Sequence, residues 1–362
     1  MVKRILFSNE AVAMRAQFNS FHRAVRRVFG AVVCAGAVLL MAASAPAQNL
    51  FVTDFEGGNV YEYTPDGVRT TIATGFTWPS GLAFDKAGNL YVGNDYNSIY
   101  GTYLDNNVTK ITPAGVQSIF AYPVYEPRGL AFDSAGNLFA VDGPSDTVTK
   151  ITPDGTPSTF ASDGLSYPDA IAINSADDVF VANYISTAIY EYTPGGVRTT
   201  FSSLVADLPM GMAFNSAGDL FVADSFYGYI DEFTPDGTNT IFASGFYDPA
   251  GLAFDSAGNL FVADYHNIFK ITPSGAVSLF ASGLNFAYGL AFQPSPELVA
   301  AETNGVIQVA VTMPPPNYST IVQVSTDLMS WTSVCTNTPP FTFTDPMGTT
   351  LPGRFYRALL GP

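Results

Sequence analysis

Two charged residues, Arg128 and Asp169, interrupt an otherwise repeated pattern in this sequence. Each directly precedes a short apolar segment, Gly129–Phe132 in one case and Ala170–Ile173 in the other. The equivalent positions elsewhere in the chain hold Ser80, Met210, Ala250 and Tyr288. A buried charge without a partner is costly, so each side chain needs an opposite charge or a ligand. We predict that the two lie close together, either as a structural ion pair or as part of a ligand site.

A second set of polar side chains recurs once in every copy of the repeat. Its members are Asp54, Asn94, Asp142, Asn183, Asp224 and Asp264. Carboxylate and amide oxygens suit a hard cation such as Ca²⁺, and Asp169, Asn183 and Asp224 are the candidate metal ligands. The alternative is that each side chain accepts hydrogen bonds from its own loop. Repetition in every copy favours this alternative.

The elements that must position these residues come from a repeat of about 40 residues. Thr-Pro-x-Gly occurs six times, and so do GLAFD and NLFVAD with their close variants. One copy, residues 249–283, reads as four short strands, A to D, because apolar, β-branched and aromatic segments alternate with turn residues. Four antiparallel strands per repeat of this length are typical of a propeller blade.

The two ends of the repeat array predict how the ring closes. The first copy begins at strand B, Asn49–Asp54, and the last copy stops after strand A, Gly289–Phe292. The last strand A therefore completes the first blade, which gives six blades and no open edge. A linear solenoid is the alternative, but it would not need a split repeat. In the ring, loops D–A and B–C form one face, here called the mouth face, and loops A–B and C–D form the other, the turn face.

The two faces differ in how much their loops vary. The A–B and C–D loops are nearly the same in every copy, so we interpret the turn face as structural. The mouth face varies and is rich in aromatic residues, and variable loops on a rigid scaffold often carry function. Its candidate ligand-binding residues, with Arg128 and Asp169, are Trp78, Tyr184, Tyr227, Tyr265, His266 and Tyr288. They either stack on sugar rings or a peptide or fill the mouth and pack between blades.

The motif PxGLAFDxxGNLFVAD resembles the NHL-repeat and SMP-30/gluconolactonase-like propellers of bacteria. The resemblance spans about 245 of the 362 residues and implies a fold more than an activity, since that superfamily holds lactonases, lyases, receptors and scaffolds. Its lactonases hold a divalent metal with a Glu, an Asn and an Asp. Asp169 matches that Asp, whereas the Asn is missing and the chain opens at Gln48 without the Glu. These departures disfavour a lactonase.

Residues 1–47 read as a secretory signal. Basic residues precede the uncharged run Val28–Ala43, and Ala45-Pro-Ala47 fits a cleavage site before Gln48. The alternative is an uncleaved membrane anchor, but the run is short for a span. Cleavage would leave 9 basic and 30 acidic residues, a formal charge of −21. Such acidity argues against nucleic acid and anionic membranes as partners. Only Cys335 would remain, which excludes an intramolecular disulfide.

The repeat stops after Phe292. We expect the propeller to span residues 48–293, a linker and first strand to span 294–316, and a small β-sandwich-like module to span 317–362. Short strand-like segments follow one another between residues 306 and 357. They loosely resemble a C-terminal β-module found on many secreted proteins of environmental bacteria.

The sequence as a whole predicts an all-β, exported six-bladed propeller, secreted or periplasmic, and monomeric. Its expected role is non-catalytic binding of a glycan, peptide or small extracellular ligand on the mouth face, with Ca²⁺ as the only cofactor suggested. One alternative is a Ca²⁺-dependent, lactonase-like hydrolase centred on Asp169. Another is a structural or adhesion module. His266, the only histidine after the signal, is more typical of a surface residue than of a base, and no nucleophile elbow, zinc motif or phosphate loop occurs.

Overall fold

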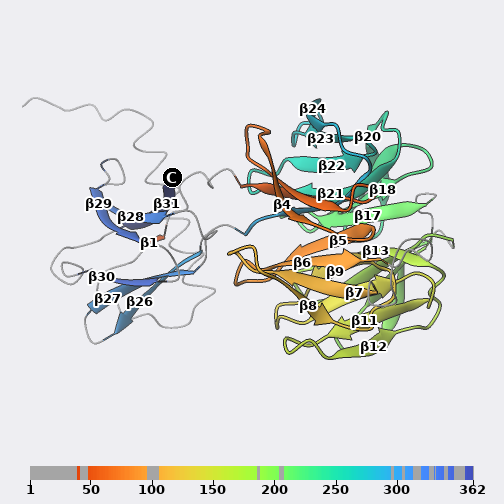
Figure 1. Ribbon diagram of the computed structural model, residues 1–362, viewed down its shortest axis with the longest axis horizontal. Coiled ribbons are helices and arrows are strands. Elements are labelled where there is room, and N and C mark those ends of the chain that lie inside the picture. The colour runs from red at the N-terminus through yellow and green to blue at the C-terminus, as the bar shows by residue number, and fades with distance from the viewer. Residues whose placement is uncertain are drawn as a thin grey trace, which may run out of the picture.

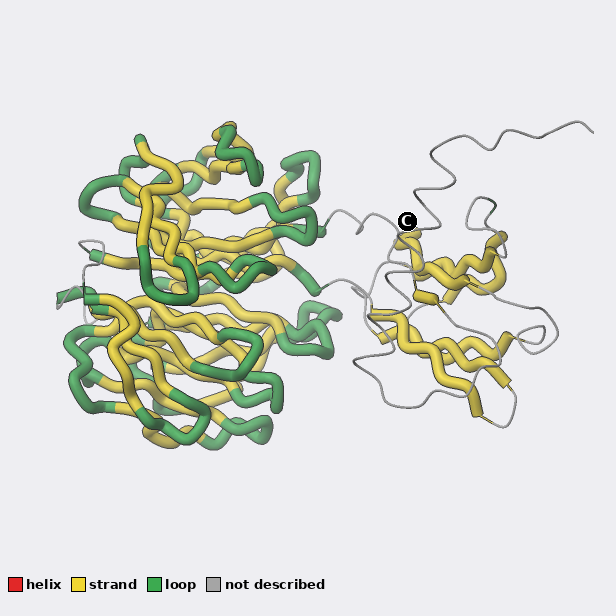
Figure 2. Tube along the Cα trace, turned by 180° about the vertical axis from the view of Figure 1, so that it is seen from behind, coloured by secondary structure: helices red, strands yellow, loops and turns green. Residues whose placement is uncertain are grey.

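The computed structural model describes residues 39–40, 48–95, 106–185, 188–203, 208–294, 297–303, 306–312, 319–325, 330, 332–337, 341–345 and 355–361. Every regular element among these residues is a β-strand (Figure 2). Apart from residues 39–40, the predicted signal segment lies outside the described residues. Within the described part of the chain, no helix is long and apolar enough to cross a membrane.

Six four-stranded antiparallel sheets form the blades, each with the strand order A, B, C, D. The A strands are β5 (Pro79–Phe84), β9 (Pro127–Phe132), β13 (Pro168–Ile173), β17 (Pro209–Phe214), β21 (Pro249–Phe254) and β25 (Ala287–Phe292). The B strands are β2 (Leu50–Asp54), β6 (Leu90–Asn94), β10 (Leu138–Asp142), β14 (Val179–Asn183), β18 (Leu220–Asp224) and β22 (Leu260–Asp264). The C strands are β3 (Asn59–Tyr63), β7 (Asn107–Ile111), β11 (Thr147–Ile151), β15 (Ile189–Tyr192), β19 (Tyr229–Phe233) and β23 (Asn267–Ile271). The D strands are β4 (Arg69–Thr74), β8 (Gln117–Ala121), β12 (Pro157–Ala161), β16 (Arg198–Ser202), β20 (Asn239–Ser244) and β24 (Val277–Ser282).

The ring closes as the split repeat predicts. Strand β25 pairs with β2, with Phe51 opposite Ala291 and Val52 opposite Leu290. The six A strands contact one another in the order β5, β9, β13, β17, β21, β25 and back to β5. Figure 1 shows the first strands, in orange, beside the last ones of the propeller. The predicted six-bladed architecture is confirmed.

The glycines of strand A are required by the close approach of neighbouring blades. A Cβ added at Gly211 would lie 2.0 Å from the carbonyl oxygen of Ala250, and one at Gly251 would lie 2.0 Å from that of Tyr288. No side chain fits at such a distance, so glycine lets the A strands pack around a narrow channel. The residue just before each glycine is therefore held close to the axis.

The hydrophobic core lies between blades. In each of the six B strands every residue is buried. The B-strand aromatic contacts the D-strand aromatic of its own blade, as in the edge-on pairs Phe180–Phe201 and Phe221–Phe242, with centroids 5.1 and 5.0 Å apart. It also contacts the strand A phenylalanine of the next blade, as in Phe180–Phe214. These packed layers hold the loops of both faces rigidly.

Strands β26 (Glu297–Thr303), β27 (Val306–Thr312), β28 (Ser319–Ser325), β29 (Thr332–Asn337), β30 (Phe341–Asp345) and β31 (Phe355–Gly361) follow the propeller. They form the sheets β26-β27-β30 and β31-β28-β29, and β1 (Leu39–Leu40) pairs with β31 (Figure 1). The sequence analysis placed strand-like segments between residues 306 and 357 and missed β26, because Pro294 and Pro296 suggested a linker.

Candidate functional site

In four of the six D–A loops of the mouth face, the last residue before strand A adopts an unusual conformation. Trp78, Glu126, Tyr167 and Leu208 have φ angles of 52°, 39°, 51° and 63°, and each precedes a proline. A bulky residue rarely adopts a positive φ, and the residue before proline normally prefers an extended conformation. Such strain is concentrated at functional sites. The aromatic-proline or acid-proline pairs were visible in the sequence, but the sequence analysis did not use them.

The polar residues that end the B strands hold these loops in place. Asn183 Oδ1 accepts a hydrogen bond from the Ser166 amide of a D–A loop (2.8 Å), whereas Asp224 Oδ1 accepts one from the Tyr227 amide of its own B–C loop (2.9 Å). Their equivalents Asn94, Asp54 and Asp264 likewise accept from backbone amides of the adjoining D–A loops. The repeated side chains therefore have the loop-binding role that the sequence analysis weighed against metal binding. Among the described residues, no three His, Cys, Asp or Glu side chains lie together as a metal site would need.

Arg128 and Asp169 meet at the centre of the mouth, as the register of β9 and β13 predicts. Arg128 Nη1 lies 3.4 Å from Asp169 Oδ2. The Tyr288 hydroxyl donates to Asp169 Oδ1 at 2.6 Å. Asp169 is fully buried, whereas 21% of the Arg128 side chain is exposed. Three A strands, β9, β13 and β25, thus each contribute one side chain to a single cluster.

Two further residues of the cluster were missed by the sequence analysis. Glu126 Oε2 lies 3.3 Å from Arg128 Nη2 and accepts a hydrogen bond of 3.2 Å from the Tyr167 hydroxyl. The Arg128 guanidinium also lies 5.4 Å from the centre of the Tyr167 ring. Both residues are among those with positive φ, so the strained loops deliver them to the mouth. Arg128 Nε is buried and has no hydrogen-bond partner among the described residues.

The electrostatics of the cluster reflect burial. Burial raises the pKa of Asp169, although Arg128 and the Tyr288 hydroxyl favour its charged form. Burial also raises the pKa of Tyr288 well above its usual value, and the charges of Asp169 and Asp95 add to that rise. Asp95 is 1% exposed, and its charge also stabilises the Arg128 guanidinium. Asp95 is therefore a third carboxylate near the mouth cluster.

A row of contacting rings, here called the aromatic arc, extends from the cluster: Trp78, Phe55, Tyr288, Phe286 and Tyr265. Phe55 stacks between Trp78 and Tyr288, with centroid distances of 5.4 and 5.3 Å. Phe286 continues the row, 6.2 Å from Tyr288 and 5.5 Å from Tyr265. The sequence analysis named three of these rings as site residues, and the structure places them in one contiguous surface through Phe55 and Phe286.

The remaining candidates lie around this centre. Tyr184 lies 5.9 Å from Tyr167 and so borders the Arg128 side of the mouth. His266 lies beside Tyr265, and its Nδ1 is 2.8 Å from the carbonyl oxygen of Leu284. A carbonyl only accepts, so Nδ1 carries the proton. Tyr227 packs with Phe226 and Tyr229 in the blade of β17–β20.

Below the cluster the channel is narrow. The A strands surround a cavity of about 60 Å³ that is lined by Arg128, Met210 and Tyr288 together with strand A glycines and apolar residues such as Leu130 and Leu252. A water molecule occupies about 30 Å³ of liquid, so this space suits a few waters and no organic ligand. Arg128 and Tyr288 therefore form the floor of the mouth, and a ligand would bind above them.

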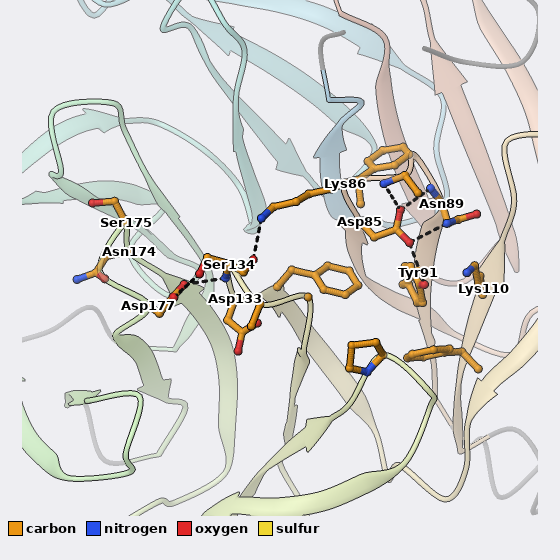
Figure 3. Close-up of a pocket in the computed structure, with 17 residues that line it drawn as sticks. Asp85, Lys86, Asn89, Tyr91, Lys110, Asp133, Ser134, Asn174, Ser175 and Asp177 are labelled. Carbon is orange, nitrogen blue, oxygen red and sulfur yellow. Dashed lines mark hydrogen bonds between the residues drawn. The ribbon is translucent and has the colours of Figure 1, made fainter. Parts of the chain in front are cut away.

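The turn face has a larger cavity, about 690 Å³, between the blades of β5–β8 and β9–β12 (Figure 3). The polar groups around its opening already form hydrogen bonds with one another. Lys86 Nζ donates to the Ser134 carbonyl at 2.7 Å, and Ser134 donates to Asp177 at 2.5 Å. A cavity of about 500 Å³ lies at the equivalent place between β17–β20 and β21–β24. Because the cavity recurs between other blades and its polar groups bond to one another, we interpret it as a wedge left by the twist of neighbouring blades. The mouth is therefore the better candidate site.

Comparisons with known proteins agree with this architecture. The family model described as NHL repeat matches residues 246–267. A chain of the nidogen/laminin complex aligns with a TM-score of 0.61 and 16% identity, covering 68% of this chain and 99% of that one. The gluconolactonase XC5397 from Xanthomonas campestris aligns at 0.54 and 15%, covering 76% and 97%. Virginiamycin B lyase from Staphylococcus aureus aligns at 0.52 and 16%, covering 75% and 94%.

No curated protein sequence matches the chain. One segment of the chain matches the NHL repeat, and the structural neighbours show a β-propeller fold. At 15–16% identity these neighbours show the fold alone, because propellers with different functions share it.

Proposed function

We propose that the chain is an exported propeller that binds a glycan, a peptide or another small extracellular ligand at its mouth, without catalysing a reaction on it. The observation that carries this proposal is the convergence of Arg128, Asp169 and Tyr288 from three blades, beside the aromatic arc. Export rests on the basic, apolar and cleavage-like segments of residues 1–47.

The alternative is that Arg128 and Asp169 form an ion pair with a structural role only. Two features favour a ligand site. The contacts of Arg128 to Asp169 and Glu126 are long, at 3.4 and 3.3 Å, compared with the 2.7–2.9 Å of a tight charge-assisted hydrogen bond. Its buried Nε has no described partner, and buried donors are nearly always paired. A ligand oxygen would complete the hydrogen bonding of this side chain.

The side chains around Asp169 favour binding over metal-dependent hydrolysis. Ca²⁺ needs six to eight oxygen ligands, whereas both Asp169 oxygens already contact other groups, one of them a guanidinium that would repel a dication. Asn183 accepts a hydrogen bond from the D–A loop at Ser166, and Asp224 accepts one from its own B–C loop at Tyr227. Because burial raises the pKa of Tyr288, its hydroxyl stays neutral and is poorly suited to act as a nucleophile.

Trp78 provides the test, because it is one of only two tryptophans and belongs to the aromatic arc. In a Trp331→Phe background, its fluorescence should change when oligosaccharides or peptides bind. Asp169→Asn and Tyr288→Phe should each abolish that change while the protein stays folded, and Lys86→Met on the turn face should not.

Two results would overturn this function. If Asp169→Asn lowers the thermal stability and leaves binding unchanged, the Arg128–Asp169 pair is structural. Lactone hydrolysis that needs both added Ca²⁺ and Asp169 would make the protein an enzyme.

A further inference from the structure

The aromatic arc continues outward from Tyr265 to the rim of the mouth. Tyr247, in the D–A loop before β21, is 77% exposed, and its ring centre lies 5.2 Å from that of Tyr265. It is the most exposed large hydrophobic side chain among the described residues. Exposed apolar surface bordered by polar groups marks an interaction site. The exposed end of the arc, rather than its buried centre, is therefore the part that a ligand reaches first.

The hairpin that carries Tyr265 departs from the usual turn chemistry. Asp264 pairs with Asn267, so Tyr265 and His266 form a two-residue hairpin loop. Tyr265 has a φ of 52°, and the positive-φ positions of such loops are normally taken by Gly, Asn or Asp. Backbone strain of this kind is concentrated at functional sites. Here it accompanies a ring that contacts both Phe286 of the arc and the exposed Tyr247.

The polar side chains beside these two rings offer hydrogen-bond acceptors. His266 is exposed, and because its Nδ1 donates to the Leu284 carbonyl, its Nε2 is an acceptor in the neutral ring. The Ser225 hydroxyl donates to Asp248 Oδ1, whereas Asp248 Oδ2 accepts no hydrogen bond from the described residues. The loops 225–228, 245–248 and 265–266 contain no Lys or Arg. A ligand that fits here must donate hydrogen bonds and carry no negative charge.

The backbone of the hairpin loop is already paired. The Tyr265 carbonyl accepts from the Ala287 amide at 2.7 Å, and the His266 carbonyl accepts from the amides of Gly283 and Leu284. A peptide that binds by strand addition needs unpaired main-chain groups, and these two carbonyls are occupied. The loop instead presents ring faces and side-chain acceptors. These suit a sugar, whose C–H groups pack on aromatic rings and whose hydroxyls donate hydrogen bonds.

We propose that Tyr247, Asp248, Tyr265 and His266, here called the outer corner, form a subsite for a neutral glycan bound at the mouth. This inference rests on the proposed binding function and narrows its ligand to a neutral oligosaccharide. One sugar unit packs on the Tyr247 ring, and its hydroxyls donate to Asp248 Oδ2 and His266 Nε2. The following units extend over the half-buried rings of Tyr265 and Phe286 towards the centre of the mouth.

Calorimetric titration with cellohexaose, maltohexaose, xylohexaose and the hexamer of N-acetylglucosamine tests the subsite. Tyr247→Ala should weaken binding of the preferred hexasaccharide about tenfold, because a stacking ring is lost. Asp248→Asn keeps an acceptor for Ser225 and replaces the free acceptor by a donor, so it should weaken binding about fivefold. Both changes affect partly or largely exposed side chains and should leave the melting temperature close to that of the parent.

The matched control is Leu279→Ala. Leu279 is 59% exposed on β24, the outer strand of the same blade. Its removal takes away exposed apolar surface outside the mouth and should leave binding unchanged.

Three results would contradict the inference, and they differ in reach. If a hexasaccharide binds and changes Trp78 fluorescence in the Trp331→Phe protein, but Tyr247→Ala binds it equally well, the outer corner is wrong and the binding function stands. If a hexapeptide library or an acidic hexuronate binds and the neutral hexasaccharides do not, the ligand class is wrong and the binding function again stands. If none of these probes binds, both proposals fall.

Discussion

The aspartates of the two propeller faces have opposite electrostatic characters. On the mouth side, burial raises the pKa values of Asp142, Asp169 and Asp264. On the turn face, hydrogen bonds from Thr and Ser lower the pKa values of Asp154, Asp177 and Asp236. The turn-face carboxylates are exposed to water and accept local hydrogen bonds, whereas the mouth carboxylates are buried away from water. Burial without full compensation is a feature of ligand sites rather than of turns.

The backbone shows the same contrast. On the turn face, positive φ angles fall mostly on the repeated glycines, such as Gly88 and Gly136. At the mouth they fall on glycines such as Gly58 and Gly75 but also on the bulky residues Trp78, Glu126 and Tyr167. Glycine adopts this conformation without steric strain, so the turn face is strain-free there. At the mouth, bulky residues adopt this strained backbone conformation, and it directs their side chains into the site.

The largest expected effect is a difference in stability between two variants, each of which removes one cation from one of the two faces. Arg128→Met should lower the free energy of unfolding at pH 7 by about 2–3 kcal/mol, because it leaves the buried Asp169 without its charge partner. Lys86→Met on the turn face should change it by less than about 0.5 kcal/mol, because Lys86 donates to a carbonyl in an exposed loop. Chemical denaturation of both variants provides the measurement.

A control for this pair uses pH. Lowering the pH should restore part of the lost stability in Arg128→Met, since Asp169 can then take up a proton. Equal losses in the two variants, or no pH dependence, would contradict the contrast between the faces.

A smaller effect is expected at Asp231, a strand C residue that is 6% exposed. Burial, with help from Asp224, raises the pKa of Asp231 to about 6. The folded state then holds its proton more tightly than the unfolded state. The stability from this proton is present below about pH 4 and is lost as the pH rises to about 6. Asp231→Asn should therefore be more stable than the parent by about 1–2 kcal/mol at pH 7 and equal to it at pH 4.

Melting temperatures of the two proteins at pH 4 and pH 7 test this. Asp177→Asn provides the contrast, because its carboxylate has a lowered pKa and its removal should bring no gain at pH 7. A parent protein whose stability does not fall relative to Asp231→Asn between these pH values would show that Asp231 is well solvated.

The fold was predictable because its causes repeat. Six copies of strand A, five of them with the same glycine and one with Ala170, constrain the same geometry as the repeated B-strand apolar run and turn signatures. The pairing of Arg128 with Asp169 also followed from register, since both break the repeat at one position. Glu126, Asp95 and Phe55 could not be found in this way. Their roles depend on strained loops and on distances between blades, which a linear pattern does not contain.

The smallest expected effect, and the most direct test of the contrast, is the order in which the aspartates titrate. Carbon-13 NMR of labelled aspartate carboxyls should show Asp154, Asp177 and Asp236 losing their protons below the usual pKa, and Asp142 and Asp264 losing theirs above it. Asn variants of Asp154 and Asp142 assign the signals. The turn-face carboxylates then contribute stability that is lost as the pH falls through their folded pKa values, whereas the mouth carboxylates contribute stability that is lost as the pH rises through theirs. Titration of Asp142 and Asp264 below Asp154 would mean that the mouth is as well solvated as the turns, and the electrostatic case for a ligand site there would fail.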